Sequence, residues 1–249
     1  MKKRTLFFVL LLASFLAKGQ VDKLPAKKGA ITMTPIFHAT LALEWDGKTV
    51  YIDPYHGAEG FAKLPAPDLV LITHAHGDHM NKETLQALDL SKAELIAPHS
   101  VAEQLTDVKV AKLTELKNGQ KLNFDGIVVE AVPMYNLPDD ETSRHKKGWG
   151  NGYVLTMGGE KLYFSGDTED IPEMRNLKGI DYAFVCMNLP YTMDVDAAAD
   201  AVIDFKPKHV YPYHFRKGDG SFSDVEKFKS IVNANEPKVD VRIRNWYPN

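Results

Sequence analysis

Short hydrophobic runs and alternating stretches recur along most of the chain and predict its secondary structure. Runs of strand length occupy 31–37, 41–45 and 49–52. The Asp46-Gly47 pair before the third run is typical of a tight hairpin turn, because glycine readily adopts the positive φ that such a turn requires. The continuous apolar run 69–72 predicts a strand that is buried on both faces. The chain therefore begins as an antiparallel sheet that leads into a buried strand.

The rest of the pattern mixes further strands with helices. Apolar residues at 195, 198, 199, 202 and 203 share one face of a predicted helix, and Asp194 stands where its N-cap belongs. A polar segment at 133–152 interrupts the pattern, and loops of this length are usually functional or disordered. This alternation predicts an α/β fold of packed layers. The remaining strands are expected at 95–97, 108–113, 120–124, 127–132, 153–156, 161–165, 182–189, 209–213 and 239–243, and the remaining helices at 81–88, 100–105 and 224–232.

The composition is that of an ordinary globular protein and excludes several classes. The chain has 249 residues, 44% of them hydrophobic, which suits one large domain. A single cysteine excludes an intrachain disulfide framework and a thiolate-rich zinc site. The sequence pI of about 6.3 and the lack of a basic tract argue against a nucleic-acid partner.

The first 19 residues have the pattern of a secretory signal peptide. Lys2, Lys3 and Arg4 precede a short apolar run, and small residues stand at the predicted cleavage site. The run is too short for a stable membrane span, so we expect export to the periplasm or secretion. Residues 20–30 then read as a linker and 31–249 as the folded domain. Cleavage would leave 26 basic against 33 acidic residues, a formal charge of −7.

The segment that follows the buried strand carries the candidate chemistry. It reads Thr73-His74-Ala75-His76-Gly77-Asp78-His79. In extended backbone, His74 and His76 point to the same face and can bind one ion, while the turn at Gly77 lets Asp78 and His79 face a second ion nearby. Imidazole with carboxylate suits zinc, manganese or iron. The plainer interpretation is a solvated histidine-rich turn.

Two ions need more ligands than this segment supplies, and three other residues are candidates. Asp167 follows a predicted strand within Ser165-Gly166-Asp167-Thr168, and His214 follows another within Tyr211-Pro212-Tyr213-His214. His145 lies in the long polar segment, beside two lysines. A single loop histidine is often only a surface residue, so position after a strand favours Asp167 and His214 over His145.

Taken in order, these motifs resemble the ligand series of the metallo-β-lactamase superfamily. The resemblance covers about residues 31–215 and is closest to the branch of L-ascorbate phosphate lactonase-like proteins and N-acyl phosphatidylethanolamine phospholipase D. Further matches are Phe37-His38-Ala39-Thr40, Ile52-Asp53-Pro54 and Pro133-Met134-Tyr135-Asn136. The resemblance implies a four-layer αβ/βα sandwich with a metal site at one edge of the two packed sheets.

The resemblance also implies a role for each candidate ligand. His74, His76 and His145 would hold the first ion. Asp78, His79 and His214 would hold the second, and Asp167 would bridge the two. The best-known zinc β-lactamases use a cysteine ligand, whereas the only cysteine here is Cys186, which lies in an apolar stretch away from these motifs. Antibiotic hydrolysis is therefore disfavoured, and Cys186 reads as a small buried hydrophobic residue.

These ligands predict hydrolysis by a hydroxide shared between two divalent ions, with zinc preferred and manganese or iron as alternatives. Asp78 would orient that hydroxide, as the resemblance suggests, and His38 or Tyr191 would protonate the leaving group. The alternative interpretation of His38 is a packed residue beside the site that takes no part in the reaction. The expected substrate is a small phosphodiester, lactone or related ester, because metal-activated water attacks all of them in nearly the same geometry.

Other interpretations stay open at this point. A metal-binding protein of the same fold without hydrolytic turnover is the main alternative, and a nuclease of the same superfamily would need a substrate-gripping extension that the pattern does not predict. Arg144, Lys146 and Lys147 either meet an anionic substrate at the rim of the site or form a solvated face. No stable membrane span is expected, and the oligomeric state is not indicated.

Overall fold

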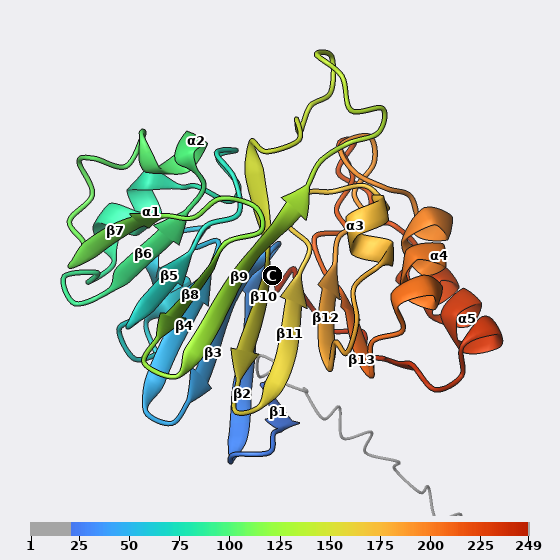
Figure 1. The fold of residues 1–249 in the computed structure, drawn as a ribbon, viewed down its shortest axis with the longest axis horizontal. Coiled ribbons are helices and arrows are strands. Elements are labelled where there is room, and N and C mark those ends of the chain that lie inside the picture. The colour runs from blue at the N-terminus through green and yellow to red at the C-terminus, as the bar shows by residue number, and fades with distance from the viewer. Residues whose placement is uncertain (1–20, 249) are drawn as a thin grey trace, which may run out of the picture.

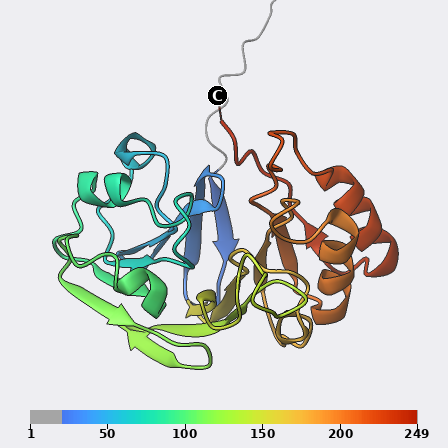
Figure 2. The same ribbon diagram turned by 90° about the horizontal axis from the view of Figure 1, so that it is seen from above.

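Two seven-stranded sheets pack face to face, with helices on their outer sides (Figures 1 and 2). The computed structural model describes residues 21–248, so the predicted signal peptide at 1–19 lies outside the described residues. The long segment after residue 134 projects beyond the sheets at the top of Figure 1. Within residues 21–248, no helix is long and apolar enough to cross a membrane.

The first sheet is antiparallel in its first half and parallel in its second. Strands β1 to β4 pair antiparallel, and β4 to β7 pair parallel. The helices α1 (Lys82–Ala87) and α2 (His99–Ala102) and the short 3-10 helix η1 (Ala58–Phe61) belong to this half of the molecule. In order across the sheet, the strands are β1 (Asp22–Pro25), β2 (Ala30–Phe37), β3 (Thr40–Trp45), β4 (Lys48–Ile52), β5 (Leu69–Leu71), β6 (Glu94–Ala97) and β7 (Lys112–Glu115).

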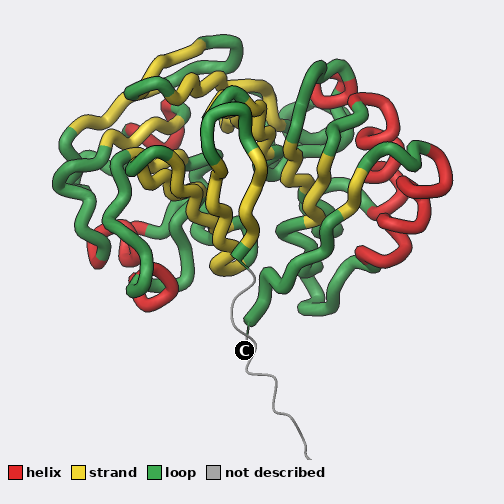
Figure 3. Tube along the Cα trace, turned by 90° about the horizontal axis from the view of Figure 1, so that it is seen from below, coloured by secondary structure: helices red, strands yellow, loops and turns green. Residues whose placement is uncertain are grey.

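The second sheet repeats this plan. Strands β8 to β11 pair antiparallel, and β11 to β14 pair parallel. Helices α3 (Pro172–Arg175), α4 (Val195–Phe205) and α5 (Val225–Asn235) flank it on the opposite side from α1 and α2 (Figure 3). In chain order, the strands are β8 (Lys121–Phe124), β9 (Ile127–Met134), β10 (Gly150–Met157), β11 (Glu160–Phe164), β12 (Tyr182–Val185), β13 (His209–Pro212) and β14 (Asp240–Val241).

Local chemistry explains why these elements begin and turn where they do. Asp46 and Gly47 both have positive φ, 50° and 73°, as the predicted hairpin between β3 and β4 requires. The Asp194 side chain accepts a hydrogen bond from the Ala197 N–H at 2.8 Å and so caps α4. The buried face of α4 includes Ala198 and Val202. The pattern of turn and cap residues therefore predicted both elements correctly.

The main hydrophobic core is shared by the two sheets. Ile31 and Leu41 of the first sheet and Leu155 of the second belong to one cluster and are fully buried. A smaller cluster lies between the first sheet and the helices α1 and α2. Its members include Val70 of β5, Leu85 of α1 and Val101 of α2. Each sheet is covered on one face by the other sheet and on its other face by helices. The molecule therefore consists of four layers in the order α, β, β and α. The predicted four-layer αβ/βα sandwich is confirmed.

Several predicted boundaries differ from the structure. The predicted linker 20–30 contains the edge strand β1, because Leu24 is fully buried and the Tyr182 hydroxyl donates to the Pro25 carbonyl at 2.8 Å. The predicted strand 108–113 begins only at Lys112, since Val108 ends a turn that is closed by its N–H bond to the Leu105 carbonyl. Strands at 182–189 and 239–243 and the helix at 100–105 are also shorter or shifted, as β12, β14 and α2.

Candidate metal centre

The histidine-rich segment forms a tight turn directly after β5. The N–H groups of His79 and Met80 both donate to the His76 carbonyl, at 3.0 and 2.7 Å, which folds the segment back on itself. The turn buries His74 and His79 completely and leaves His76 and Asp78 partly exposed. The four predicted ligands of this segment therefore surround one small volume from one side.

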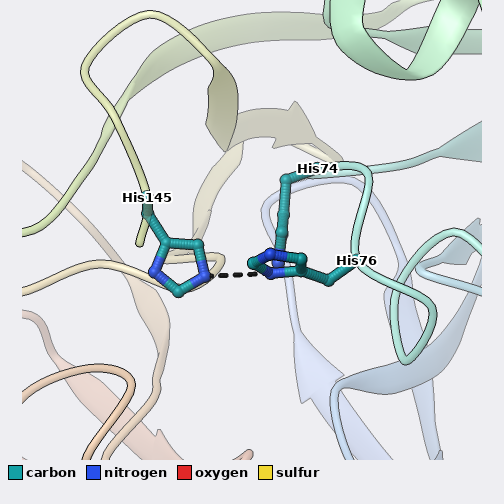
Figure 4. A group of neighbouring side chains, drawn as sticks. All are labelled: His74, His76 and His145. Carbon is teal, nitrogen blue, oxygen red and sulfur yellow. Dashed lines mark hydrogen bonds between the residues drawn. The ribbon is translucent and has the colours of Figure 1, made fainter. Parts of the chain in front are cut away.

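His145 joins His74 and His76 from the long segment between β9 and β10 (Figure 4). The ligand nitrogens of the three residues lie within 4.8 Å of one another, and His145 Nε2 is 3.1 Å from His76 Nδ1. Asn136 Oδ1 lies 2.9 Å from His145 Nδ1 and also accepts from the His145 backbone N–H at 2.8 Å. Asn136 thereby places the ring proton on Nδ1, which leaves the Nε2 lone pair facing the other histidines.

The remaining predicted ligands gather beside this group. His79 Nε2 lies 2.9 Å from His214 Nε2, and His214 Nε2 lies 3.6 Å from Asp78 Oδ2. His79 Nδ1 is 2.8 Å from Asp53 Oδ2, and both side chains are fully buried. Because the buried carboxylate accepts the Nδ1 proton, it turns Nε2 toward the site.

Asp167 lies between the two groups. Its Oδ1 is 3.3 Å from His79 Nε2 and 3.2 Å from His214 Nε2, while its Oδ2 is 3.6 Å from His145 Nε2. The preceding Gly166 has φ of 60°, and a Cβ there would lie 2.8 Å from the Met134 sulfur, so the loop needs glycine. The carboxylate therefore faces both histidine groups at once.

The chemistry of these donors fits metal binding. His74 Nε2 and Asp167 Oδ1 are buried and lack a hydrogen-bond partner among the described residues. Such atoms are costly to bury unless something binds them. His74, His79 and Asp167 also offer ligand atoms within 4.8 Å of one another, as do His38, Asp78 and His214. Imidazole nitrogens and carboxylate oxygens are ligands of zinc and related ions.

Burial keeps two of the imidazoles neutral, as a metal ligand must be. It lowers the pKa of His145 to about 4 and holds the pKa of His74 well below its usual value. For Asp167, burial raises the pKa, but the nearby His214 and His79 outweigh it, so the pKa of this carboxyl lies well below its usual range. The neutral imidazoles of His145 and His74 thus lie beside an ionised Asp167 carboxylate.

His38, predicted as a leaving-group acid, lies against the second group. Tyr247 Oη accepts from the Arg216 N–H at 3.0 Å, so its own proton can go to His38 Nδ1, 3.0 Å away. His38 Nε2 then carries the ring proton and donates it to Asp78 Oδ2 at 3.1 Å. Burial, together with the nearby His214, lowers the pKa of His38 to about 4. His38 is therefore a neutral donor that holds Asp78.

The structure brings all seven predicted ligands together and adds partners that the sequence analysis missed. Asp53 and Asn136 stand within motifs that carried the family resemblance, which was the available signal for them. Tyr247 had no such signal. Among residues 21–248, Cys186 belongs to none of the ligand groups. It is buried, and burial raises the pKa of its thiol to about 12. Its interpretation as a small buried residue is confirmed.

Comparison with known proteins now places this geometry in a family. The family model of the beta-lactamase superfamily domain matches residues 32–214, which include every predicted ligand. This chain belongs to the metallo-β-lactamase superfamily. The resemblance to the L-ascorbate phosphate lactonase-like branch stays a prediction.

Relatives of this superfamily member share most of its length. A UPF0173 metal-dependent hydrolase of Thermococcus onnurineus is 32% identical over 74% of this chain and 85% of its own. A second UPF0173 metal-dependent hydrolase, from Pyrococcus abyssi, is 30% identical over 82% of this chain and 92% of its own. A crystal structure from Parabacteroides distasonis, described as a candidate metal-dependent hydrolase, has a TM-score of 0.81 at 38% identity and covers 92% of this chain and 100% of its own.

Proposed function

We propose that this superfamily member is a hydrolase that uses two divalent metal ions to cleave a small phosphodiester, lactone or related ester. The observation that carries the proposal is the position of Asp167, whose two oxygens face separate histidine groups at 3.2 to 3.6 Å. A carboxylate in this position suits a bridging ligand that sets the distance between two ions. The names of the relatives support metal-dependent hydrolysis.

Two bound ions would supply a nucleophile by lowering the pKa of a shared water, and a Lewis acid for the oxygen under attack. Zinc suits the imidazole and carboxylate donors, with manganese or iron as alternatives. The roles of the protein groups follow from their hydrogen bonds. Asp53 and Asn136 orient His79 and His145, so that less reorganisation is needed when the site is filled.

Asp78 and His38 would handle the protons. The Asp78 side chain is 38% exposed and lines a cavity with His38, so its carboxylate can accept a hydrogen bond from the attacking water. His38 Nε2–H is one candidate proton donor for a leaving group, and Asp78, its hydrogen-bond partner, would return to it the proton taken from the attacking water. Tyr191 lines the same cavity and is the second candidate donor.

Metal analysis and a hydrolysis panel test the proposal together. Purified protein reconstituted with zinc, manganese or iron should hold close to two ions per chain, and Asp167→Ala should lose at least one of them. Chromogenic phosphodiesters, lactones and thioesters should include a substrate whose hydrolysis stops with chelator and in His76→Ala. Asp200→Asn, an exposed change on α4, serves as the control.

Two outcomes would contradict the proposal at different levels. No bound metal after reconstitution would remove the metal centre altogether. Bound metal without turnover of any substrate in the panel would instead favour the alternative, a metal-binding protein of the same fold without hydrolytic activity.

We also propose that residues 1–19 direct export to the periplasm or the medium, on the basis of their sequence pattern alone. The mass of the protein purified from the periplasmic fraction or the medium tests this. A chain that starts at Gln20 is the expected result, whereas an intact Met1 in the cytoplasmic fraction would contradict it.

A further inference from the structure

A cavity of about 250 Å³ opens beside the metal centre. Its lining includes His38, Asp78 and His214 of the candidate metal centre, together with Tyr191, Arg216 and Lys217. The cavity thus joins the predicted ligands and two basic side chains in one space. A substrate whose scissile bond faces Asp78 and His214 would place its remaining atoms against those basic side chains.

Arg216 is held in place by aromatic rings. Its guanidinium carbon lies 5.5 Å from the ring centroids of both Phe37 and Tyr247. Its backbone N–H also donates to the Tyr247 hydroxyl at 3.0 Å. Stacking restricts the side chain without using its N–H donors, which remain available to a planar or tetrahedral anion.

Neither basic side chain in the cavity forms an ion pair with another described residue. In the part of the chain that the structure describes, no carboxylate lies within 4.0 Å of the Arg216 guanidinium or the Lys217 ammonium. Both residues are half-buried, where an unpaired cation attracts an anion more strongly than at an open surface. The chain as a whole has a formal charge of −3, so these cations are a local feature.

One further cation, Arg144, lies against the ring of Tyr191, which lines the cavity. Of the three basic residues for which the sequence analysis left a place at the rim of the site open, Lys146 pairs with Glu141 at 2.6 Å and Lys147 pairs with Glu173 at 2.7 Å. Arg144 has no such partner among residues 21–248, and its guanidinium carbon lies 4.4 Å from the centroid of the Tyr191 ring. Arg144 therefore stands next to the cavity, while the two lysines do not contribute a free charge to it.

We propose that the substrate carries an anionic group, a phosphate or a carboxylate, that Arg216 and Lys217 bind in this cavity while the ester bond lies at the metal centre. This inference rests on the proposed function, because it assigns the substrate class of the same site. A guanidinium binds either anion through paired N–H donors, and the lysine adds a second positive charge. A neutral ester of the same size would leave these cations without a partner.

A matched pair of esters tests the inference on the full, metal-loaded protein. In 4-nitrophenyl hydrogen glutarate, a carboxylate replaces one terminal hydrogen of 4-nitrophenyl butyrate, and the scissile ester is the same. The wild type should prefer the glutarate ester in kcat/KM by at least about tenfold, as expected for a charged hydrogen bond. Arg216→Gln should abolish most of that preference, Lys217→Gln should reduce it, and Lys92→Gln, an exposed control, should retain it.

Binding measurements separate failure of this inference from failure of the proposed function. If neither ester is hydrolysed, calorimetric titrations with glutarate and with inorganic phosphate decide the question. Weaker binding to Arg216→Gln than to the wild type and Lys92→Gln by at least about tenfold would support the anion site without turnover. The tighter of the two probes identifies the preferred anion. Equal binding by all variants, or an ester preference unchanged in Arg216→Gln, would overturn the inference. Arg216→Met, which removes the charge but keeps an unbranched side chain against Phe37 and Tyr247, replaces Arg216→Gln if the latter does not fold.

Discussion

The Asp53 carboxylate lies 2.8 Å from His79 Nδ1, and neither side chain is exposed. The same carboxylate accepts two more hydrogen bonds from Thr73, from its N–H and its hydroxyl, both at 2.7 Å. Asp53 follows β4 and Thr73 follows β5, which are parallel neighbours in the first sheet. The sheet register therefore brings the carboxylate beneath the histidine-rich turn and fixes the direction of His79.

Asp53→Asn should weaken metal binding. An amide has only one oxygen, so it cannot accept from Thr73 and from His79 as the carboxylate does. We expect the affinity for at least one ion to fall by about 10–100-fold, as for other partners of metal-binding histidines. Competition with a chromogenic chelator measures the affinity. Asp200→Asn is the matched control, and unchanged affinity in Asp53→Asn would show that this contact does not support the site.

Tyr247→Phe should slow turnover while leaving the metal content unchanged. The substitution keeps the ring that packs against Phe37 and removes the hydroxyl, which pairs with His38 Nδ1 and also accepts from the Arg216 N–H. Without that bond, His38 can adopt the other tautomer and no longer donate to Asp78. We expect kcat to fall about three- to tenfold, which corresponds to one hydrogen bond. Loss of metal in this variant would point instead to a structural role for Tyr247.

Metal binding should release a proton at neutral pH. Burial lowers the pKa of His79, but Asp167, Asp53 and Asp78 outweigh it and raise the pKa well above its usual value. Without bound ions, His79 is thus protonated at pH 7, whereas a metal ligand must be neutral. The apparent affinity should therefore rise with pH through neutrality, with about one proton released from this residue. Calorimetry in buffers of different ionisation enthalpy measures the release, and a pH-independent affinity would contradict it.

Phe184→Ala should strongly destabilise the domain. The Phe184 ring is fully buried and stacks on Phe164 and Tyr211, with centroid distances of 4.7 and 4.9 Å. Its loss should lower the free energy of unfolding by about 3–5 kcal/mol, as for other buried aromatic truncations. Urea denaturation measures this value. Phe222→Ala is the control, since Phe222 is 53% exposed and should cost less than about 1 kcal/mol. Equal losses in the two variants would contradict the assigned core.

Much of the fold followed from periodicity because most strands here alternate or run apolar in agreement with their burial. The hairpin at Asp46-Gly47 and the cap at Asp194 were predicted from local chemistry alone. The misplaced elements have a different cause. Strand β1 has Leu24 as its only large apolar side chain. It is held by pairing with β2 and by tyrosine hydroxyls of the second sheet, so no local signal marks it. The structure alone showed that residues 22–25 belong to the domain.

The sequence by itself determined the ligand types and the turn that holds four of them, since residues 74–79 are adjacent in the chain and follow a buried strand. The tertiary structure decided which groups orient and charge the site. His38 and Tyr247 are 209 residues apart in the chain, and His79 and His214 are 135 apart, yet each pair lies within 3.0 Å. It also paired Lys146 and Lys147 with glutamates, and among residues 21–248 it left Arg216 without an ion-pair partner beside the candidate metal centre. Hydrogen-bond partners and ion pairs depend on distances between remote segments, and only the packing of the two sheets sets those distances.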